Sequence, residues 1–115
     1  MLAYIVDDDK LFAECLARYL PDDYSVQYFS NVIDTINAMN SAVPDVIFLD
    51  VLLDGPDGFT LLNEMASYSD TGRVPIIIVS SLSIAPSGLE NYGVIAVLNK
   101  ADLTPESVVE CLAKI

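Results

Sequence analysis

The chain has 115 residues, of which 53% are hydrophobic, and its 17 acidic and five basic side chains give a net charge of −12. This length and hydrophobic content predict one folded domain with its own core and exclude a disordered chain. The acidic surface repels phosphate backbones, which argues against direct nucleic-acid binding, and no apolar run reaches the roughly 20 residues that a membrane span needs.

The cysteine and histidine counts bear on compartment and chemistry. Cys15 and Cys111 lie in apolar segments without metal-ligand spacing, and we interpret both as small buried residues that stay reduced. No secretion signal is visible at the N-terminus, so a cytoplasmic location is expected. The chain has no histidine, which excludes His-dependent triads, His metal sites and a phospho-histidine of its own.

The first half of the chain alternates strand and helix patterns. Residues 2–6 form a short apolar run typical of a buried strand, and residues 10–20 have apolar side chains at helical spacing. Residues 24–29 are rich in strand-forming types and predict a second strand. Asn31 is positioned to cap a second helix, which should end before Pro44.

The second half repeats this alternation. Residues 46–49 and 76–79 are apolar runs too short for helices, and they predict strands, at residues 46–50 and 76–79, that are buried on both faces of a parallel sheet. A third helix should start near Gly58, residues 67–73 should be loop, and residues 94–98 should form a fifth strand. Thr104, Pro105 and Glu106 give a strong start to a last helix that runs to the C-terminus.

The segment between the fourth and fifth strands, residues 82–93, is the exception. Pro86 and Gly88 leave room there for only a short or irregular helix. Strand and helix patterns still alternate five times with short connections. This pattern predicts an α/β fold in one domain, residues 1–115, with a doubly wound parallel sheet covered by helices on both faces.

Polar residues collect where the predicted strands end. They are Asp7, Asp8 and Asp9 after the first strand, Asp50 after the third, Ser80 after the fourth and Lys100 after the fifth. In open parallel sheets, ligands bind outside these carboxyl ends. Two carboxylates about 4 Å apart repel by roughly 4 kcal/mol at an effective dielectric of 20, so the cluster favours a bound cation such as Mg²⁺. An aspartate beside such an ion can attack a phosphoryl group.

Each residue alone has a simpler interpretation. An Asp after a strand is more often a turn or cap residue, a strand-end Ser is usually a cap, and a single Lys is usually a surface residue. Asp54 and Asp57 lie in a Gly/Pro loop and are best interpreted as turn formers. The joint pattern at four strand ends is what favours a site.

The motifs also resemble a known family over essentially the whole length of the chain. They are Val6-Asp7-Asp8-Asp9, Pro44-Asp-Val-Ile-Phe-Leu-Asp50 followed by Asp57-Gly58, Pro75-Ile-Ile-Ile-Val-Ser80, and Lys100 after the last strand. In this order and spacing the chain is similar to the receiver domain of two-component response regulators. The resemblance implies a flavodoxin-like (βα)5 fold with strand order 2-1-3-4-5.

The resemblance also implies the roles of individual residues. Asp50 would accept phosphate, Asp7 and Asp8 would bind Mg²⁺ with Asp50 and the Leu52 backbone carbonyl, Ser80 would be the switch hydroxyl, and Lys100 would pair with the phosphate. The donor would be a phospho-histidine on a histidine kinase or phosphotransfer protein, which fits a chain without histidine. The only catalysis implied is self-phosphorylation and slow self-dephosphorylation. A C-terminal effector domain or a partner protein, and a dimer formed on phosphorylation, are the implied outputs.

Three positions depart from the family pattern. Asp54 stands where the family usually has proline, Ala101 replaces the proline that follows the lysine, and Val97 replaces the switch aromatic. A cis bond after Lys100 is therefore not expected, because non-proline cis bonds are costly. The output face that the family usually forms around its fourth helix, fifth strand and fifth helix is the part that this chain matches least.

Two other functions share part of this sequence pattern. A phosphatase of the haloacid dehalogenase type needs a second Asp two residues after the first, where this chain has Leu52. A pseudo-receiver, which binds proteins without taking phosphate, is favoured by the altered switch positions and opposed by the intact set of site residues. Leu52 and Leu82 would not orient an attacking water, so a phosphate on Asp50 is expected to be long-lived.

Overall fold

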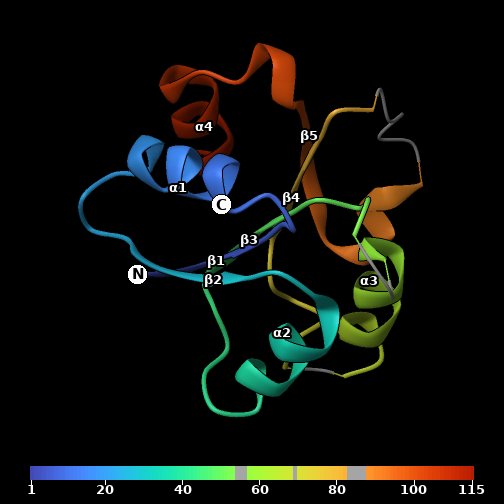
Figure 1. Ribbon diagram of the computed structural model, residues 1–115. Coiled ribbons are helices and arrows are strands. Elements are labelled where there is room, and N and C mark those ends of the chain that lie inside the picture. Colours follow the sequence, from blue (N-terminus) through green and yellow to red (C-terminus); the bar gives the residue numbers. More distant parts are fainter. Residues whose placement is uncertain (54–56, 69, 83–87) are drawn as a thin grey trace.

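The computed structural model describes residues 1–53, 57–68, 70–82 and 88–115. Strands and helices alternate along the chain (Figure 1). The strands are β1 (Leu2–Val6), β2 (Ser25–Phe29), β3 (Val46–Leu49), β4 (Ile76–Ser80) and β5 (Val94–Asn99). The helices are α1 (Lys10–Tyr19), α2 (Val32–Met39), α3 (Gly58–Ala66) and α4 (Pro105–Leu112), with 3₁₀ helices η1 (Leu89–Tyr92) and η2 (Lys100–Asp102).

The five strands form one parallel sheet in the order β2-β1-β3-β4-β5, which confirms the predicted fold class and strand order. β1 and β3 lie side by side, with Val6 opposite Leu49 at their carboxyl ends. Because all strands run the same way, the residues that follow them meet at one edge of the sheet. Among the described residues, no helix is long and apolar enough to cross a membrane.

Helices cover both faces of the sheet, α1 and α4 on one and α2 and α3 on the other (Figure 1). Alternate residues of each strand enter the two cores, so that Ile47 packs with α2 and α3 whereas Phe48 packs with α1 and α4. Both side chains are almost completely buried. Burial on both faces explains why the central strands are uninterrupted apolar runs.

Each α-helix begins at a residue whose side chain accepts a hydrogen bond from a backbone N–H in the first turn. These residues are Asp9 for α1, Asn31 for α2, Asp57 for α3 and Thr104 for α4. At Thr104 the bond is reciprocal, because the Ser107 hydroxyl accepts from the Thr104 backbone N–H. The predicted helix starts at Asn31 and Thr104 are confirmed.

The connection between β4 and β5 differs from the other crossovers. Its described part contains only the 3₁₀ helix Leu89–Tyr92, bracketed by Gly88 and Gly93, both with positive φ (85° and 84°). The prediction of a short or irregular segment is confirmed for this part, whereas Pro86 lies outside the described residues. Val97, at the position of the family's switch aromatic, is partly buried and packs on the α2–α3 side of the sheet.

Two boundaries and one additional element differ from the prediction. β3 ends at Leu49, so Asp50 already belongs to the loop, and α4 ends at Leu112 instead of running to the C-terminus. Lys100 begins the short 3₁₀ helix η2, which the sequence did not indicate. Its start is fixed by the Asn99 side chain, which accepts a hydrogen bond from the Ala101 N–H at 2.9 Å.

Candidate functional site

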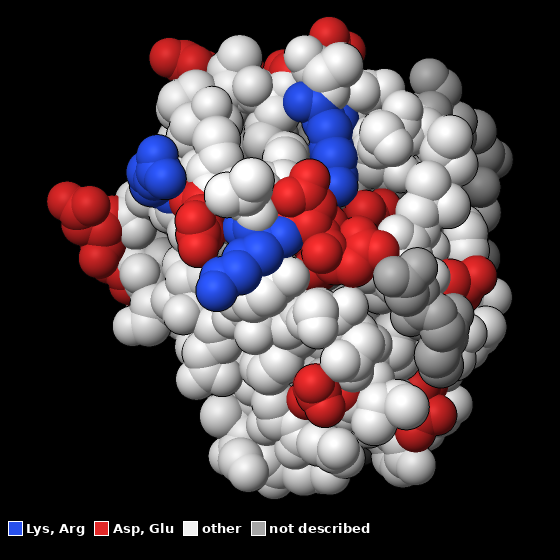
Figure 2. Space-filling view, in the orientation of Figure 1, with Lys and Arg blue, Asp and Glu red and all other residues white. Residues whose placement is uncertain are grey.

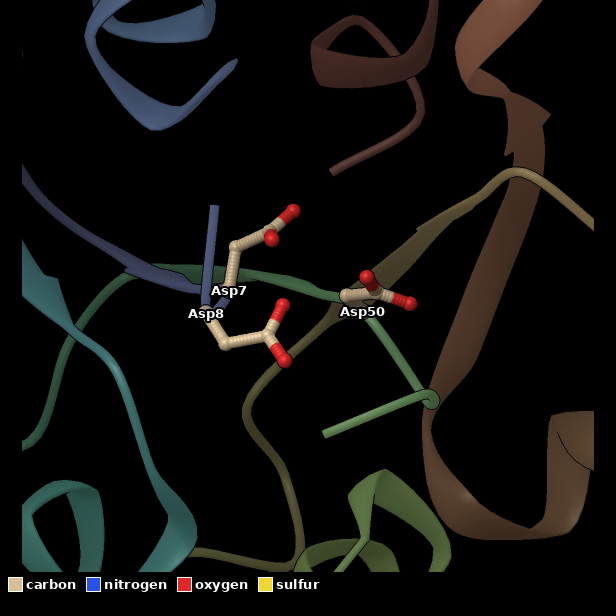
Figure 3. A group of neighbouring side chains, drawn as sticks. All are labelled: Asp7, Asp8 and Asp50. Atoms are coloured by element: carbon tan, nitrogen blue, oxygen red, sulfur yellow. The ribbon is translucent and has the colours of Figure 1, made fainter. Parts of the chain in front are cut away.

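Three carboxylates meet where β1 and β3 end. Asp7 and Asp8 directly follow β1, Asp50 directly follows β3, and the Asp50 N–H donates to the Val6 carbonyl at 2.9 Å, which ties the two strand ends together. One oxygen from each carboxylate lies within 4.8 Å of the other two. Figure 3 shows the three side chains around a common space. Asp7 and Asp50 are only 2% and 6% exposed, whereas Asp8 is exposed.

Lys100 joins the two buried carboxylates. Its Nζ lies 2.8 Å from Asp7 Oδ2 and 3.1 Å from Asp50 Oδ2, and its side chain is 18% exposed. The ammonium also lies 4.4 Å from the centre of the Phe12 ring, within the range of a cation–π contact. In the orientation of Figure 1, acidic side chains gather near the middle of the surface with basic side chains beside them (Figure 2).

The remaining oxygens of the buried carboxylates accept backbone hydrogen bonds. Asp7 Oδ1 accepts from the Asp9 N–H at 2.8 Å, and Asp50 Oδ1 accepts from the Leu52 N–H at 3.0 Å. Each carboxylate therefore has one oxygen on a backbone N–H two residues later and the other on the same ammonium. These bonds fix the orientation of both side chains, which is what a preorganised site requires.

Burial has opposite electrostatic consequences for the two partners of this ion pair. Burial raises the pKa of Asp7 above its ordinary value, although the hydrogen bonds from Lys100 and Asp9 oppose the rise. Burial alone lowers the pKa of Lys100, but its hydrogen bonds and charge interactions with Asp7 and Asp50 outweigh burial and raise the pKa overall. The lysine thus stays charged beside the two buried carboxylates.

Asp9 does not belong to the cluster. It was grouped with Asp7 and Asp8 from its place after β1, but its Oδ1 accepts from the Phe12 N–H at 3.1 Å and begins helix α1. Asp57 has the same kind of role at α3, as the turn-former interpretation anticipated. Sequence reasoning missed Phe12 altogether, because its contact with Lys100 joins residues 88 positions apart and leaves no local pattern.

For the other predicted site residues, the structure shows only some of the expected contacts with the three carboxylates. Ser80 ends β4 and is fully buried, and its Oγ accepts from the Leu82 N–H at 3.2 Å. Within the described residues, no hydrogen bond joins the Ser80 hydroxyl to Asp50. Leu52 directs its N–H at Asp50, and the role of its carbonyl as a ligand stays a prediction. Asp54 lies outside the described residues.

The donor set fits a small hard cation. Carboxylate oxygens are the ligands that Mg²⁺ takes in proteins, usually one or two carboxylates together with water. Three converge here, and the structure balances two of them with the ammonium of Lys100. A divalent cation at this place would compete with Lys100 for the Oδ2 atoms of Asp7 and Asp50.

Asp8→Asn is expected to stabilise the metal-free protein slightly and to weaken the stabilisation that Mg²⁺ gives. Asp8 is exposed and, unlike Asp7, has no ion pair in the described structure, so its charge mainly repels Asp7 and Asp50. For an exposed charge the gain should stay below about 1 kcal/mol. Thermal melts with and without Mg²⁺ measure both effects. Asp22→Asn, in the exposed turn before β2, is the control, and equal Mg²⁺ shifts in the two variants would contradict the site.

Comparison with known proteins places these features in a family. The model of the response regulator receiver domain matches residues 3–103. A protein-glutamate methylesterase/protein-glutamine glutaminase of Syntrophomonas wolfei is 31% identical over 103 residues, which cover 86% of this chain and 29% of that protein. A protein of the same description from Geobacter metallireducens is 30% identical over 115 residues, which cover 92% of this chain and 31% of that protein. The chain thus spans about a third of the length of these curated relatives.

Solved structures have the same fold. The crystal structure of a putative response regulator from Chloroflexus aurantiacus superposes with a TM-score of 0.86. It is 26% identical in sequence, and the match covers 98% of this chain and 94% of that one.

Proposed function

The chain belongs to the response regulator receiver domain family, and we propose that it accepts a phosphoryl group on Asp50 in a Mg²⁺-dependent reaction. The observation that supports this most directly is the pairing of two buried carboxylates, Asp7 and Asp50, whose Oδ2 atoms bind one ammonium beside a third carboxylate. A buried, oriented carboxylate next to exchangeable positive charge is suited to attack phosphorus.

The proposed reaction transfers one phosphoryl group. An oxygen of the Asp50 carboxylate forms a bond to phosphorus while the bond from phosphorus to a nitrogen of the donor phospho-histidine breaks. The electron pair of that bond returns to the imidazole, which takes a proton. The product is an acyl phosphate on Asp50 with a charge of about −1.5 to −2. Its formation needs Asp50 ionised and held still, and the hydrogen bond from the Leu52 N–H restrains it.

We propose that Asp7, Asp8 and Asp50, with the Leu52 backbone carbonyl, hold the Mg²⁺. When bound, the ion neutralises negative charge on the phosphoryl oxygens and helps to orient the group. Lys100, released from the Oδ2 atoms, pairs with a phosphoryl oxygen, and the buried Ser80 hydroxyl turns toward another. In the described structure the only cationic side chain on these carboxylates is that of Lys100. Lys100 is therefore the group that Mg²⁺ would replace on the Oδ2 atoms of Asp7 and Asp50.

The phosphate donor must come from elsewhere, because the chain has no histidine. We propose a histidine kinase or a phosphotransfer protein as donor, acting in the cytoplasm, where the free Cys15 and Cys111 would stay reduced. The phosphorylated surface would act on a C-terminal effector domain or a partner protein, or would form a dimer. With 12 excess negative charges, direct binding to nucleic acid is not part of the proposal.

The test is incubation of the chain with acetyl phosphate, with and without Mg²⁺, followed by intact-mass measurement. A mass increase of one phosphoryl group only with Mg²⁺ is expected, together with Mg²⁺-dependent thermal stabilisation in beryllofluoride. If neither effect is observed, the proposed reaction is wrong, and the remaining interpretation is a pseudo-receiver that binds proteins without taking phosphate.

The phosphorylated state is expected to last minutes or longer. Leu52 and Leu82 are 47% and 50% exposed beside the site, and neither side chain can hold a water for attack on phosphorus. Leu52→Asn should shorten the lifetime several-fold, because an amide can orient water. Loss of phosphate after removal of acetyl phosphate measures it, with Val109→Asn on α4 as the exposed control. A wild-type lifetime of seconds would refute the expectation.

A further inference from the structure

The first turn of α3 lies directly against the backbone that carries Asp50. The Gly58 N–H donates to the Val51 carbonyl at 3.2 Å, and Gly58 is buried. A Cβ atom at Gly58 would lie 2.6 Å from Val51 Cα and 2.9 Å from the Asp50 carbonyl oxygen. Real Cβ atoms essentially never come closer than 3.0 Å to such atoms. No side chain of any size fits between α3 and the loop in this arrangement.

Both of these atoms are backbone atoms of residues 50–51, so no side chain can relieve the contact by turning away. The φ angle of Gly58 is not positive, so conformational freedom is not what this glycine supplies. Ala is the better helix former, and helix propensity alone would favour it here. The glycine matters instead because it has no Cβ, which lets α3 lie close to residues 50–51.

The same stretch of backbone sets the place of the Asp50 carboxylate. The Asp50 N–H donates a hydrogen bond to the Val6 carbonyl, and Gly58 lies in close contact with the neighbouring Val51 backbone. The Asp50 carboxylate is in turn bonded to the Leu52 N–H within the same loop. Any displacement of residues 50–51 therefore carries the carboxylate away from Asp7 and Lys100.

We propose that Gly58 is a positioning residue that fixes the Asp50 carboxylate relative to Asp7 by letting α3 lie directly on residues 50–51. The proposal rests on the proposed phosphoryl transfer at Asp50. A Cβ would force the two segments apart by at least 0.4 Å, the difference between 2.6 Å and the 3.0 Å limit. Metal-ligand distances tolerate about 0.2 Å, and displacement of reacting atoms by about 1 Å can cost a hundredfold in rate.

The chain offers a matched control at Gly72, in the loop between α3 and β4. A Cβ there would lie 2.9 Å from the Tyr68 carbonyl oxygen, so Gly72→Ala also brings a Cβ too close to backbone, although by less than Gly58→Ala does. It does so at the C-terminal end of α3, whereas Gly58 stands at the N-terminal end, beside the loop that carries Asp50. Comparing Gly58→Ala with Gly72→Ala separates displacement of the site from general destabilisation.

The experiment measures two quantities for the 115-residue chain and both variants, at a temperature well below all three melting transitions. They are the rate of phosphate incorporation from acetyl phosphate at saturating Mg²⁺, and the Mg²⁺ dissociation constant by calorimetry. Gly58→Ala is expected to lower the rate at least about tenfold and to weaken Mg²⁺ binding several-fold. Gly72→Ala should stay within about twofold of wild type in both.

The outcomes distinguish the two proposals. If wild type takes no phosphate, the proposed function fails. If wild type is phosphorylated and Gly58→Ala matches it, or if both variants lose activity equally, Gly58 does not position the site.

Should Gly58→Ala not fold, Asp57 provides a second pair of variants, because its carboxylate caps α3 through the Thr60 N–H at 3.1 Å. Asp57→Ala should then be slower than Asp57→Asn, which keeps a cap without the charge, and equal rates would overturn the proposal.

Discussion

Asp50→Asn is expected to reduce phosphate incorporation from acetyl phosphate by at least about a thousandfold, because loss of a nucleophile costs this much or more. The amide keeps the shape of the side chain but is a poor nucleophile, so the fold should remain. Asn can still accept the Leu52 N–H bond that Asp50 Oδ1 accepts now. Intact-mass measurement and a thermal melt check both halves of this expectation.

Chemical stability of the attached phosphate identifies the acceptor independently. An acyl phosphate is cleaved by hydroxylamine, whereas a phosphate ester on a hydroxyl such as that of Ser80 is not. Wild-type label should be fully sensitive to hydroxylamine. Asp57→Asn, which removes a nearby charge but keeps the cap of α3, should take phosphate at a rate close to that of wild type. Label on Asp50→Asn at a wild-type rate would place the acceptor elsewhere.

Lys100→Met is expected to destabilise the metal-free protein by about 2–3 kcal/mol, which lowers its melting temperature by roughly 10 °C. Methionine keeps an apolar stem beside Phe12 but leaves Asp7 and Asp50 buried with no positive partner. Breaking a fully buried pair costs 3–5 kcal/mol, and the 18% exposure of Lys100 places this case below that range.

The same variant should respond more strongly to Mg²⁺ than wild type does. In wild type the ion must displace an ammonium from two carboxylates, whereas in Lys100→Met the carboxylates are unopposed. Thermal melts across a Mg²⁺ titration measure this, with Lys114→Met as the exposed-lysine control. If Mg²⁺ stabilises Lys100→Met no more than wild type, the ion and the lysine do not share the Oδ2 atoms.

The fold could be predicted from the sequence because its central strands are buried on both faces. Such strands leave uninterrupted apolar runs, as at residues 46–49 and 76–79, and their parallel pairing follows from the helices between them. The segment before β5 was less predictable because two glycines and a proline give no period. The extra 3₁₀ turn at Lys100–Asp102 depends on one side-chain bond from Asn99, which no periodicity indicates.

The site was predictable at the level of which residues gather, and less so at the level of contacts. Alignment of the strand ends brings Asp7, Asp8 and Asp50 together, and it brings Lys100 to two of them. The sequence could not separate Asp9 from Asp7 and Asp8, because a strand-end aspartate and a helix cap look the same in sequence. The cation–π contact of Lys100 with Phe12 and the close backbone contact of Gly58 with Val51 depend on tertiary packing between separate elements.

The lateral spacing of the acidic pair has a general origin. Asp7 and Asp50 directly follow Val6 and Leu49, which face each other in the ladder between β1 and β3. Neighbouring strands run about 4.8 Å apart whatever their side chains are. The sheet therefore sets the distance between the two backbone positions that carry the carboxylates. The loops beyond the sheet can differ in length and charge without changing that distance. An acidic pair of the same spacing could be grafted onto other adjacent parallel strands whose ends are in register.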